Sequence, residues 1–171
     1  MKYLKLICLF FCVVYASHSF ALSTDKQQPA LLQADSATIN HKTGISVYTG
    51  HVKLVQGSTV ITADVLTTLS TNQNQLELAT AIGNPATYST LPDNTTMMFN
   101  ASALTLKYQV PSQQVDLTGN AKALQGNDSF AGPHIIYDIK QQLVISPPSD
   151  QGHTTILIQP TQKVTLPNYS K

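Results

Sequence analysis

The stretch Thr49-Gly50-His51-Val52-Lys53-Leu54-Val55-Gln56-Gly57 returns later in the chain as Thr118-Gly119-Asn120-Ala121-Lys122-Ala123-Leu124-Gln125-Gly126. Threonine, glycine, lysine, glutamine and glycine recur at one constant offset, with small or apolar residues between them. Self-similarity at a fixed period indicates one supersecondary unit used twice.

Both copies follow a segment in which apolar and polar residues alternate, at 45–49 and at 115–118. Strict alternation is typical of a half-buried strand. Gly50 and Gly119 then stand where strand continues into strand, a position at which glycine permits a bulge or sharp bend. The Gln-Gly pairs that close each copy predict turns. A sheet that bends and turns back at this interval can curl into a roll.

The rest of the chain shows the same pattern of short alternating segments separated by Gly, Pro, Asn and Asp clusters. Strands joined by tight turns pair antiparallel, because parallel pairs need long crossovers. The sequence therefore predicts an all-β sandwich or roll, formed by residues 22–171 as a single domain whose last residues are flexible. A membrane barrel is the alternative, but its strands need about 9–11 residues and aromatic girdles, and tryptophan is absent.

Residues 1–21 have the features of a cleaved signal peptide. Lys2 and Lys5 precede the apolar run 6–15, and Ser19-Phe20-Ala21 fits the small-x-small rule for cleavage after Ala21. An uncleaved anchor is the competing interpretation, but the run is shorter than the roughly 18–20 residues that span a bilayer. The sequence predicts export.

Charge and cysteine content exclude several classes of function. Cys8 and Cys12 both lie in the predicted signal, so the exported chain would have neither a disulfide nor a thiol. Without Lys2 and Lys5 it would carry eight lysines against nine acidic residues, and the chain has no arginine. Isolated lysines form no basic stripe, so we expect no nucleic-acid partner.

An enzyme is the rival class, and few residues support it. His41, His51, His134 and His153 are isolated, and no metal-binding spacing joins them. No nucleophile elbow or phosphate-binding loop is present. We therefore predict no catalytic residue, no metal and no cofactor.

Several segments together resemble the LptA/OstA family of periplasmic lipopolysaccharide transport proteins of Gram-negative bacteria. They are Tyr48 to Gly57, Ile61-Thr62-Ala63-Asp64, Gly83-Asn84-Pro85-Ala86-Thr87-Tyr88, Leu117 to Ala121, and Thr154-Thr155-Ile156-Leu157. The resemblance runs from about residue 31 to residue 160. Their order and spacing are more specific than any one segment.

The resemblance implies a twisted, partly open antiparallel β-jelly roll whose apolar interior groove holds the acyl chains of lipid A. It also implies head-to-tail stacking in the periplasm, and pairing with related jelly-roll domains of the inner-membrane anchored and outer-membrane components of the transport system. The function implied is a bridge between the two membranes in outer-membrane assembly. A periplasmic β scaffold that binds only protein partners is the alternative.

Alternation provides candidates for the groove face. The predicted lining residues are Leu32, Val52, Leu54, Ile61, Tyr88, Leu104, Leu106, Tyr108, Leu117, Ile135, Tyr137 and Ile139. An ordinary filled core would use the same residues. Lys53 and Lys122 alternate with apolar neighbours and should point outward.

The two ends of the roll form a separate hypothesis. Soluble proteins usually blunt sheet edges with charge or proline, whereas 154–158 carries no charge before Pro160. We predict that an oligomer forms by strand addition through two edges. These are Leu31, Leu32 and Gln33 at one end and Thr155, Ile156, Leu157 and Ile158 at the other.

Overall fold

A computed structural model describes residues 25–159, and within them one antiparallel sheet of ten strands makes up the fold. The predicted signal at 1–21 and the residues from 160 onward lie outside this range. The elements are the 3₁₀ turn η1 (Asp25–Gln27), β1 (Leu31–Gln33), β2 (Ser36–Asn40), β3 (Ile45–Gln56), β4 (Thr59–Ser70), β5 (Leu76–Thr90), β6 (Phe99–Gln109), β7 (Gln114–Gln125), β8 (Asp128–Asp138), β9 (Leu143–Ile145) and β10 (Thr155–Leu157). No helix in 25–159 is long and apolar enough to cross a membrane.

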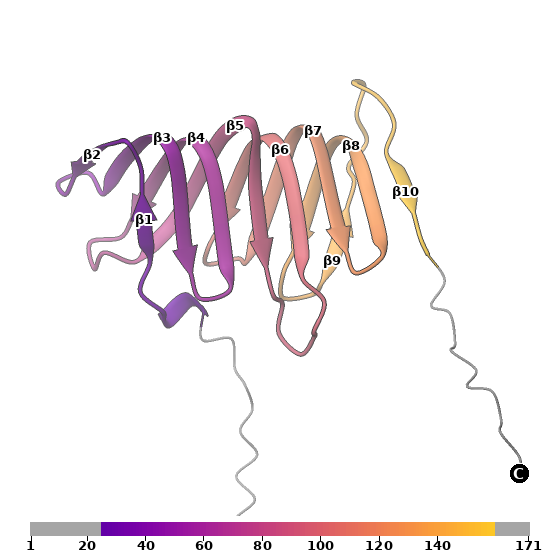
Figure 1. The fold of residues 1–171 in the computed structure, drawn as a ribbon, viewed down its shortest axis with the longest axis horizontal. Helices are drawn as coiled ribbons and strands as arrows, with labels where there is room; N and C mark the ends of the chain where they lie inside the picture. Colours follow the sequence, from indigo (N-terminus) through magenta and orange to yellow (C-terminus); the bar gives the residue numbers. More distant parts are fainter. Residues whose placement is uncertain (1–24, 160–171) are drawn as a thin grey trace, which may run out of the picture.

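The strands follow one another across the sheet in the order β1-β3-β4-β5-β6-β7-β8-β10 (Figure 1). The short strand β2 also pairs with β3, and β9 also pairs with β8. Each end of the sheet therefore carries two short strands on one long strand. Short turns join the long strands, as the sequence predicted for antiparallel pairing, except that the longer loop 91–98 joins β5 to β6.

Every long strand breaks its register at the same level of the sheet. Between β3 and β4 the break lies after Thr49, and between β7 and β8 it lies after Thr118. Gly50 has φ +79° and Gly119 has φ +80°, a conformation that side chains disfavour. The bulges predicted at the two repeated glycines are confirmed. We call this level the crease; it comprises 50–51, 64, 83–85, 104, 119–120 and 133.

The crease folds the sheet over on itself, and Figure 1 shows the strands arching at this level. The first half-sheet, in front, comprises 52–56, 59–63, 86–90, 99–103, 121–125 and 128–132 with β1 and β10. The second half-sheet comprises 45–49, 65–70, 76–82, 105–109, 114–118 and 134–138 with β2 and β9. Their inner faces meet and form the core.

Cross-strand partners share a face of a sheet, so the register arranges the inner residues in rows that run across the strands. The first inner row is Leu32, Leu54, Ile61, Tyr88, Ala101, Ala123, Phe130 and Ile156, which spans β1 to β10. The second inner row is Ile39, Ser46, Thr68, Ala79, Tyr108, Val115, Tyr137 and Val144, which spans β2 to β9. Both rows are apolar apart from Ser46 and Thr68.

Aromatic rings of β5, β6 and β8 join the two half-sheets away from the crease. Phe99 of the first half-sheet stacks on Tyr137 of the second, with ring centroids 3.6 Å apart and planes 6° apart. Tyr88 of the first half-sheet and Tyr108 of the second form a tilted pair, with ring centroids 5.6 Å apart and planes 56° apart. The tilted pair adds to the stabilisation that comes from burial. The interior is therefore filled where these rings meet.

Leu104 differs from the prediction that it faces the interior, because it lies on the outer face and is 40% exposed. The crease crosses β6 at this residue, and the register of β6 with β7 shifts between Ser102 and Thr105. Ala103 and Leu106 face inward on either side of the shift. The alternation of inward and outward side chains along β6 is therefore interrupted at Leu104, because the bulge adds one residue.

We expect Gly119→Ala to lower the free energy of unfolding by about 1–2 kcal/mol, because an L-residue at φ +80° is strained. The added Cβ would also lie only 3.1 Å from Leu104 Cβ. Urea denaturation measures the change. The matched control is Asn120→Gly, at the neighbouring residue with φ +51°, which should be nearly neutral. Equal effects of the two substitutions would contradict a conformational role for Gly119.

Candidate functional site

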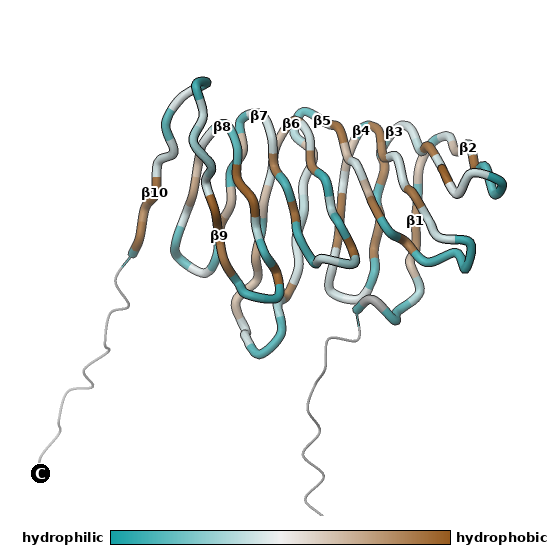
Figure 2. The backbone as a smooth tube through the Cα atoms, turned by 180° about the vertical axis from the view of Figure 1, so that it is seen from behind, coloured by the Kyte–Doolittle hydropathy of each residue, from teal (hydrophilic) through white to brown (hydrophobic). Residues whose placement is uncertain are grey.

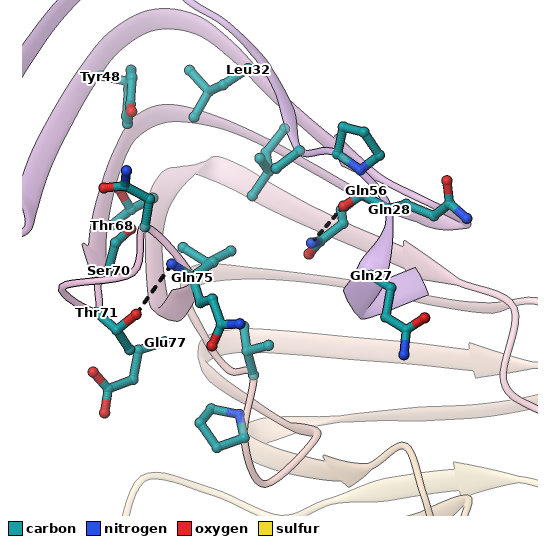
Figure 3. Close-up of a pocket in the computed structure, with 17 residues that line it drawn as sticks. Gln27, Gln28, Leu32, Tyr48, Gln56, Thr68, Ser70, Thr71, Gln75 and Glu77 are labelled. Carbon is teal, nitrogen blue, oxygen red and sulfur yellow. Dashed lines mark hydrogen bonds between the residues drawn. The ribbon is translucent and has the colours of Figure 1, made fainter. Parts of the chain in front are cut away.

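The interior opens to solvent at the end of the sheet that carries β1. A cavity of about 770 Å³ lies there between the two half-sheets (Figure 3). Leu32 and Leu54 line it from the first half-sheet, and Tyr48 and Leu76 line it from the second. Polar residues of the 71–75 turn form its rim. The cavity has an apolar floor and a polar mouth, which suits a ligand with one apolar part.

The opposite end of the interior also presents apolar residues. Ile156 ends the first inner row and is 53% exposed, and Val144 ends the second. Figure 2 shows hydrophobic segments repeated on consecutive strands from one end of the sheet to the other. The first inner row is thus apolar along the whole long axis and accessible at both ends, and the second is apolar except at Ser46 and Thr68.

The structure places eleven of the twelve predicted lining residues in or against the core. Nine are buried: Val52, Leu54, Ile61, Tyr88, Leu106, Tyr108, Leu117, Ile135 and Tyr137. Leu32 and Ile139 are half-buried and pack against them. Only Leu104 lies outside. Lys53 and Lys122 point outward, as expected. Contact of any of these residues with lipid stays a prediction.

Sequence reasoning missed several residues of the same lining. Phe99, Leu66 and Val115 are all fully buried. Phe99 alternates with Ala101 and Ala103, so the period of two could have indicated its inward orientation. Its stacking on Tyr137 could not be predicted, because the two rings belong to different half-sheets.

Three tyrosines place hydroxyl groups within this apolar lining. Burial raises the pKa of Tyr88, and it raises the pKa of Tyr108 and of Tyr137 to about 12. All three are therefore neutral at physiological pH. The hydroxyls of Tyr88 and Tyr137 are buried and form no hydrogen bond within the described residues.

Comparison with known proteins agrees with this architecture. The family described as LptA/(LptD N-terminal domain) LPS transport protein matches residues 31–143, from β1 to the start of β9. The chain belongs to this family.

Two relatives and one crystal structure illustrate the similarity. Lipopolysaccharide export system protein LptH of Pseudomonas aeruginosa is 35% identical over 147 residues, 84% of each chain. Lipopolysaccharide export system protein LptA of Escherichia coli K12 is 31% identical over 143 residues, 82% of this chain and 76% of that one. The crystal structure of P. aeruginosa LptH, described as the periplasmic component of the lipopolysaccharide transport device, superposes with a TM-score of 0.74 at 33% identity, covering 80% of this chain and 99% of that one.

This family member has the β-jelly roll fold of LptH, all-β and not closed into a barrel. The two short strands at each end remain hydrogen-bonded on one side only within the described sheet. β1 and β10 stand at the two ends, as predicted. The strand at the second end stops at Leu157, so Ile158, predicted as part of it, lies just beyond and is 70% exposed.

Opposite the crease, the free margins of the two half-sheets approach each other. Gln142, in the turn between β8 and β9, donates its Nε2–H to the carbonyl oxygen of Asp93, in the loop between β5 and β6, at 2.9 Å. Asp25 of η1 accepts a hydrogen bond from the backbone N–H of Ser58 at 2.9 Å. The groove of this LptA-family chain is thus bridged by a loop contact along its open side.

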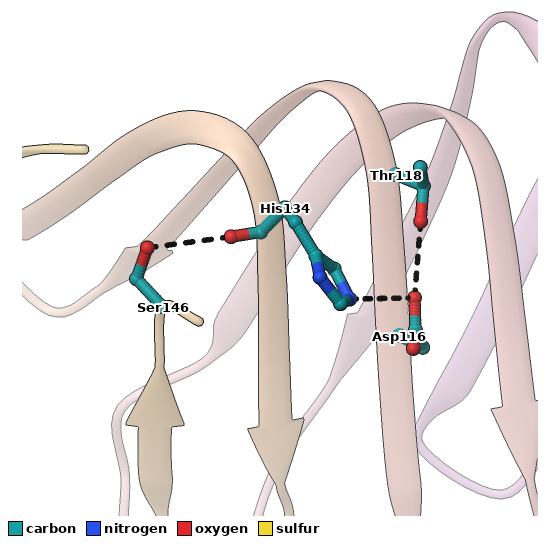
Figure 4. A network of polar contacts seen from close by, with 4 residues as sticks. All are labelled: Asp116, Thr118, His134 and Ser146. Carbon is teal, nitrogen blue, oxygen red and sulfur yellow. Dashed lines mark hydrogen bonds and ion pairs between the residues drawn. The ribbon is translucent and has the colours of Figure 1, made fainter. Parts of the chain in front are cut away.

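The polar cluster on the outer face of β7 and β8 differs from a catalytic triad (Figure 4). His134 Nε2 lies 3.1 Å from Asp116 Oδ1, and the Thr118 hydroxyl donates to the same oxygen. The Ser146 hydroxyl, however, donates to the backbone carbonyl of His134 and not to its ring. A nucleophile needs the ring nitrogen as its base. Within 25–159, no three His, Cys, Asp or Glu side chains are grouped closely enough to hold a metal ion.

A second His–Asp pair fixes the corner between β1 and β2 to the crease. Asp35 Oδ2 lies 2.8 Å from His51 Nδ1, and the Asp35 N–H donates to the carbonyl oxygen of Gly50. A Cβ at Gly50 would collide with the Asp35 carboxylate, so the glycine also makes room for this pair. His51, which the sequence left isolated, thus has a partner in the fold.

The hydrogen bond to Asp35, followed by its negative charge, raises the pKa of His51 above 6.5. Because the folded state binds the His51 proton more tightly than the unfolded state, the protonated pair stabilises the fold fully below about pH 6.5. This stabilisation is lost as pH rises through the folded-state pKa. We therefore expect Asp35→Asn to be more destabilising at pH 5.5 than at pH 8.5 in urea denaturation. Asp64→Asn is the control, because the charge of Asp64 acts on His51 more weakly than that of Asp35. A difference independent of pH would contradict this role.

Proposed function

We propose that this protein is a periplasmic lipopolysaccharide carrier that shields the acyl chains of lipid A between its two half-sheets. The observation that carries the proposal is the continuous first inner row, which runs from Leu32 to Ile156 and is accessible at both ends. The relatives described as lipopolysaccharide export proteins support the same cargo.

The shielding is a physical task with no chemical step. Each methylene exposed to water costs about 0.8 kcal/mol. An acyl chain of roughly a dozen carbons therefore faces a penalty on the order of 10 kcal/mol, which an apolar groove removes. The sugar part of the cargo is hydrophilic and can stay in water outside the groove. We infer a transport protein rather than an enzyme.

Passage along the whole groove requires the protein to adapt. The rings of Phe99 and Tyr137 stack between the half-sheets, so an acyl chain can pass at that level only if the rings separate. The loop contact between Asp93 and Gln142 crosses the open side of the groove. The link between the acyl chain inside and the sugar outside must pass through this side. A single neutral hydrogen bond contributes about 0.5–1.5 kcal/mol, which binding of cargo can readily offset.

The two ends of the sheet suit head-to-tail assembly. β1 and β10 are short, uncharged and hydrogen-bonded on one side within the described sheet, so each can accept a further strand. We propose that one copy adds through β10 to β1 of the next, and that related jelly-roll domains of the inner-membrane and outer-membrane components pair with the same edges. The predicted signal at 1–21 would deliver the chain to the periplasm.

Photocrosslinking to lipopolysaccharide tests the cargo. A photoreactive residue replaces Leu32 or Tyr48, which line the cavity, and in matched controls it replaces Gln33 or Val47, the adjacent residues on the outer face. We expect crosslinks from Leu32 and Tyr48 only, because neighbouring strand residues point to opposite faces.

Equal crosslinking on both faces would contradict an interior site. No crosslinking from any of the four positions, in a protein with a normal β circular-dichroism spectrum, would leave the alternative of a scaffold that binds only proteins.

Deletion of residues 154–171 tests the assembly. The deletion removes β10 but none of the buried core residues found within 25–159, so we expect a folded monomer at concentrations at which the full chain forms oligomers. Sedimentation velocity over a range of concentrations measures this. Oligomers that persist after the deletion would show that β10 is not the edge used.

A further inference from the structure

The hydroxyl of Tyr137 is a buried polar group without a partner among the described residues, in a mostly apolar interior. The side chain as a whole is fully buried. A buried hydroxyl without a partner is destabilising, and each one in a native structure calls for an explanation. Phenylalanine would fill nearly the same volume at this position without that penalty.

The position of the ring brings its hydroxyl to the path proposed for the cargo. Tyr137 belongs to the second inner row, between Val115 and Val144, and stacks on Phe99 of the opposite half-sheet. An acyl chain that passes between the half-sheets at the level of this stack must separate the two rings. The hydroxyl then borders the chain, in surroundings from which water is excluded.

The second unpaired hydroxyl lies on the facing half-sheet. Tyr88 is 1% exposed, and its hydroxyl is approached by those of Thr59 and Thr90, which hydrogen-bond to each other at 3.0 Å. Neither threonine reaches hydrogen-bonding geometry with it. Tyr88 therefore has a weaker need for an outside partner than Tyr137.

A group that enters with an apolar ligand can supply the partner that the Tyr137 hydroxyl lacks among the described residues. A neutral tyrosine hydroxyl both donates and accepts, and the best match is another neutral hydroxyl. The sugar hydroxyls stay outside the groove, and a carbonyl that links chain to sugar lies at its margin. A hydroxyl on the acyl chain itself is carried inside.

We propose that Tyr137, assisted by Tyr88, hydrogen-bonds the hydroxyl of a 3-hydroxyacyl chain, so that the groove distinguishes hydroxylated from unsubstituted acyl chains. The proposal rests on the proposed function, because it requires acyl chains to enter the interior. It adds a polar recognition element to a groove that otherwise selects only for apolar surface.

A cycle that removes one hydroxyl from the protein and one from the ligand tests it. Affinities of the purified full-length exported chain for 3-hydroxytetradecanoate and for tetradecanoate are measured by calorimetry, in the wild type and in Tyr137→Phe. We expect the variant to bind 3-hydroxytetradecanoate about threefold to tenfold more weakly, the range for one neutral hydrogen bond, and to bind tetradecanoate unchanged. Its thermal midpoint should equal or exceed that of the wild type, because the unpaired hydroxyl is gone.

Tyr108→Phe is the matched control, since Tyr108 faces the same interior but lines a small cavity near Asp25 at the margin of the half-sheets. It should leave the ratio of the two affinities unchanged, and Tyr88→Phe should change it less than Tyr137→Phe does. Equal weakening of both fatty acids in Tyr137→Phe, or no change in either, would overturn the proposal while the proposed function stands. A wild type that crosslinks to lipopolysaccharide from Leu32 but binds neither fatty acid would also overturn the proposal, whereas failure of that crosslinking would contradict the proposed function itself.

Discussion

The column of bulges at the crease is the constraint on which the rest of the molecule depends. A sheet with one apolar face must bury that face against something, and this chain has no helical layer among its described residues. Because the register breaks at one level in every long strand, the sheet folds over on itself there, and its two halves form the two layers that enclose the core. Gly50 and Gly119 make this possible, because their positive φ angles are accessible to glycine.

Packing between the half-sheets follows from the sizes of the inner residues. Eight buried alanines share the inner faces with a few large rings. Alanine is the cross-strand partner of two of these rings, since Ala101 pairs with Tyr88 and Ala79 pairs with Tyr108. Small neighbours leave room for each ring to reach the opposite half-sheet. The interior is therefore closed where aromatic residues meet and open where the rows end, at β1 and at β10.

The fold could be predicted from the sequence wherever a local signal marked it. Alternation identified the inner face, and the repeated glycines identified two bulges. The crease also crosses β4 at Asp64, β6 at Leu104 and β8 at Pro133, where no glycine marks it, so Leu104 was placed on the wrong face. Contacts such as Phe99 with Tyr137 and Asp35 with His51 join residues distant in sequence, and only the folded register brings them together.

The proposed groove and the proposed assembly depend on one and the same register. At each end the inner rows stop at residues of the short strands, Leu32 and Ile39 at one end and Ile156 and Val144 at the other. Because side chains alternate with a period of two, a strand added one residue out of register would bring outward residues such as Gln33 or Thr155 into the row. An apolar groove that continues from copy to copy therefore requires that Ile156 of one copy pair in line with Leu32 of the next.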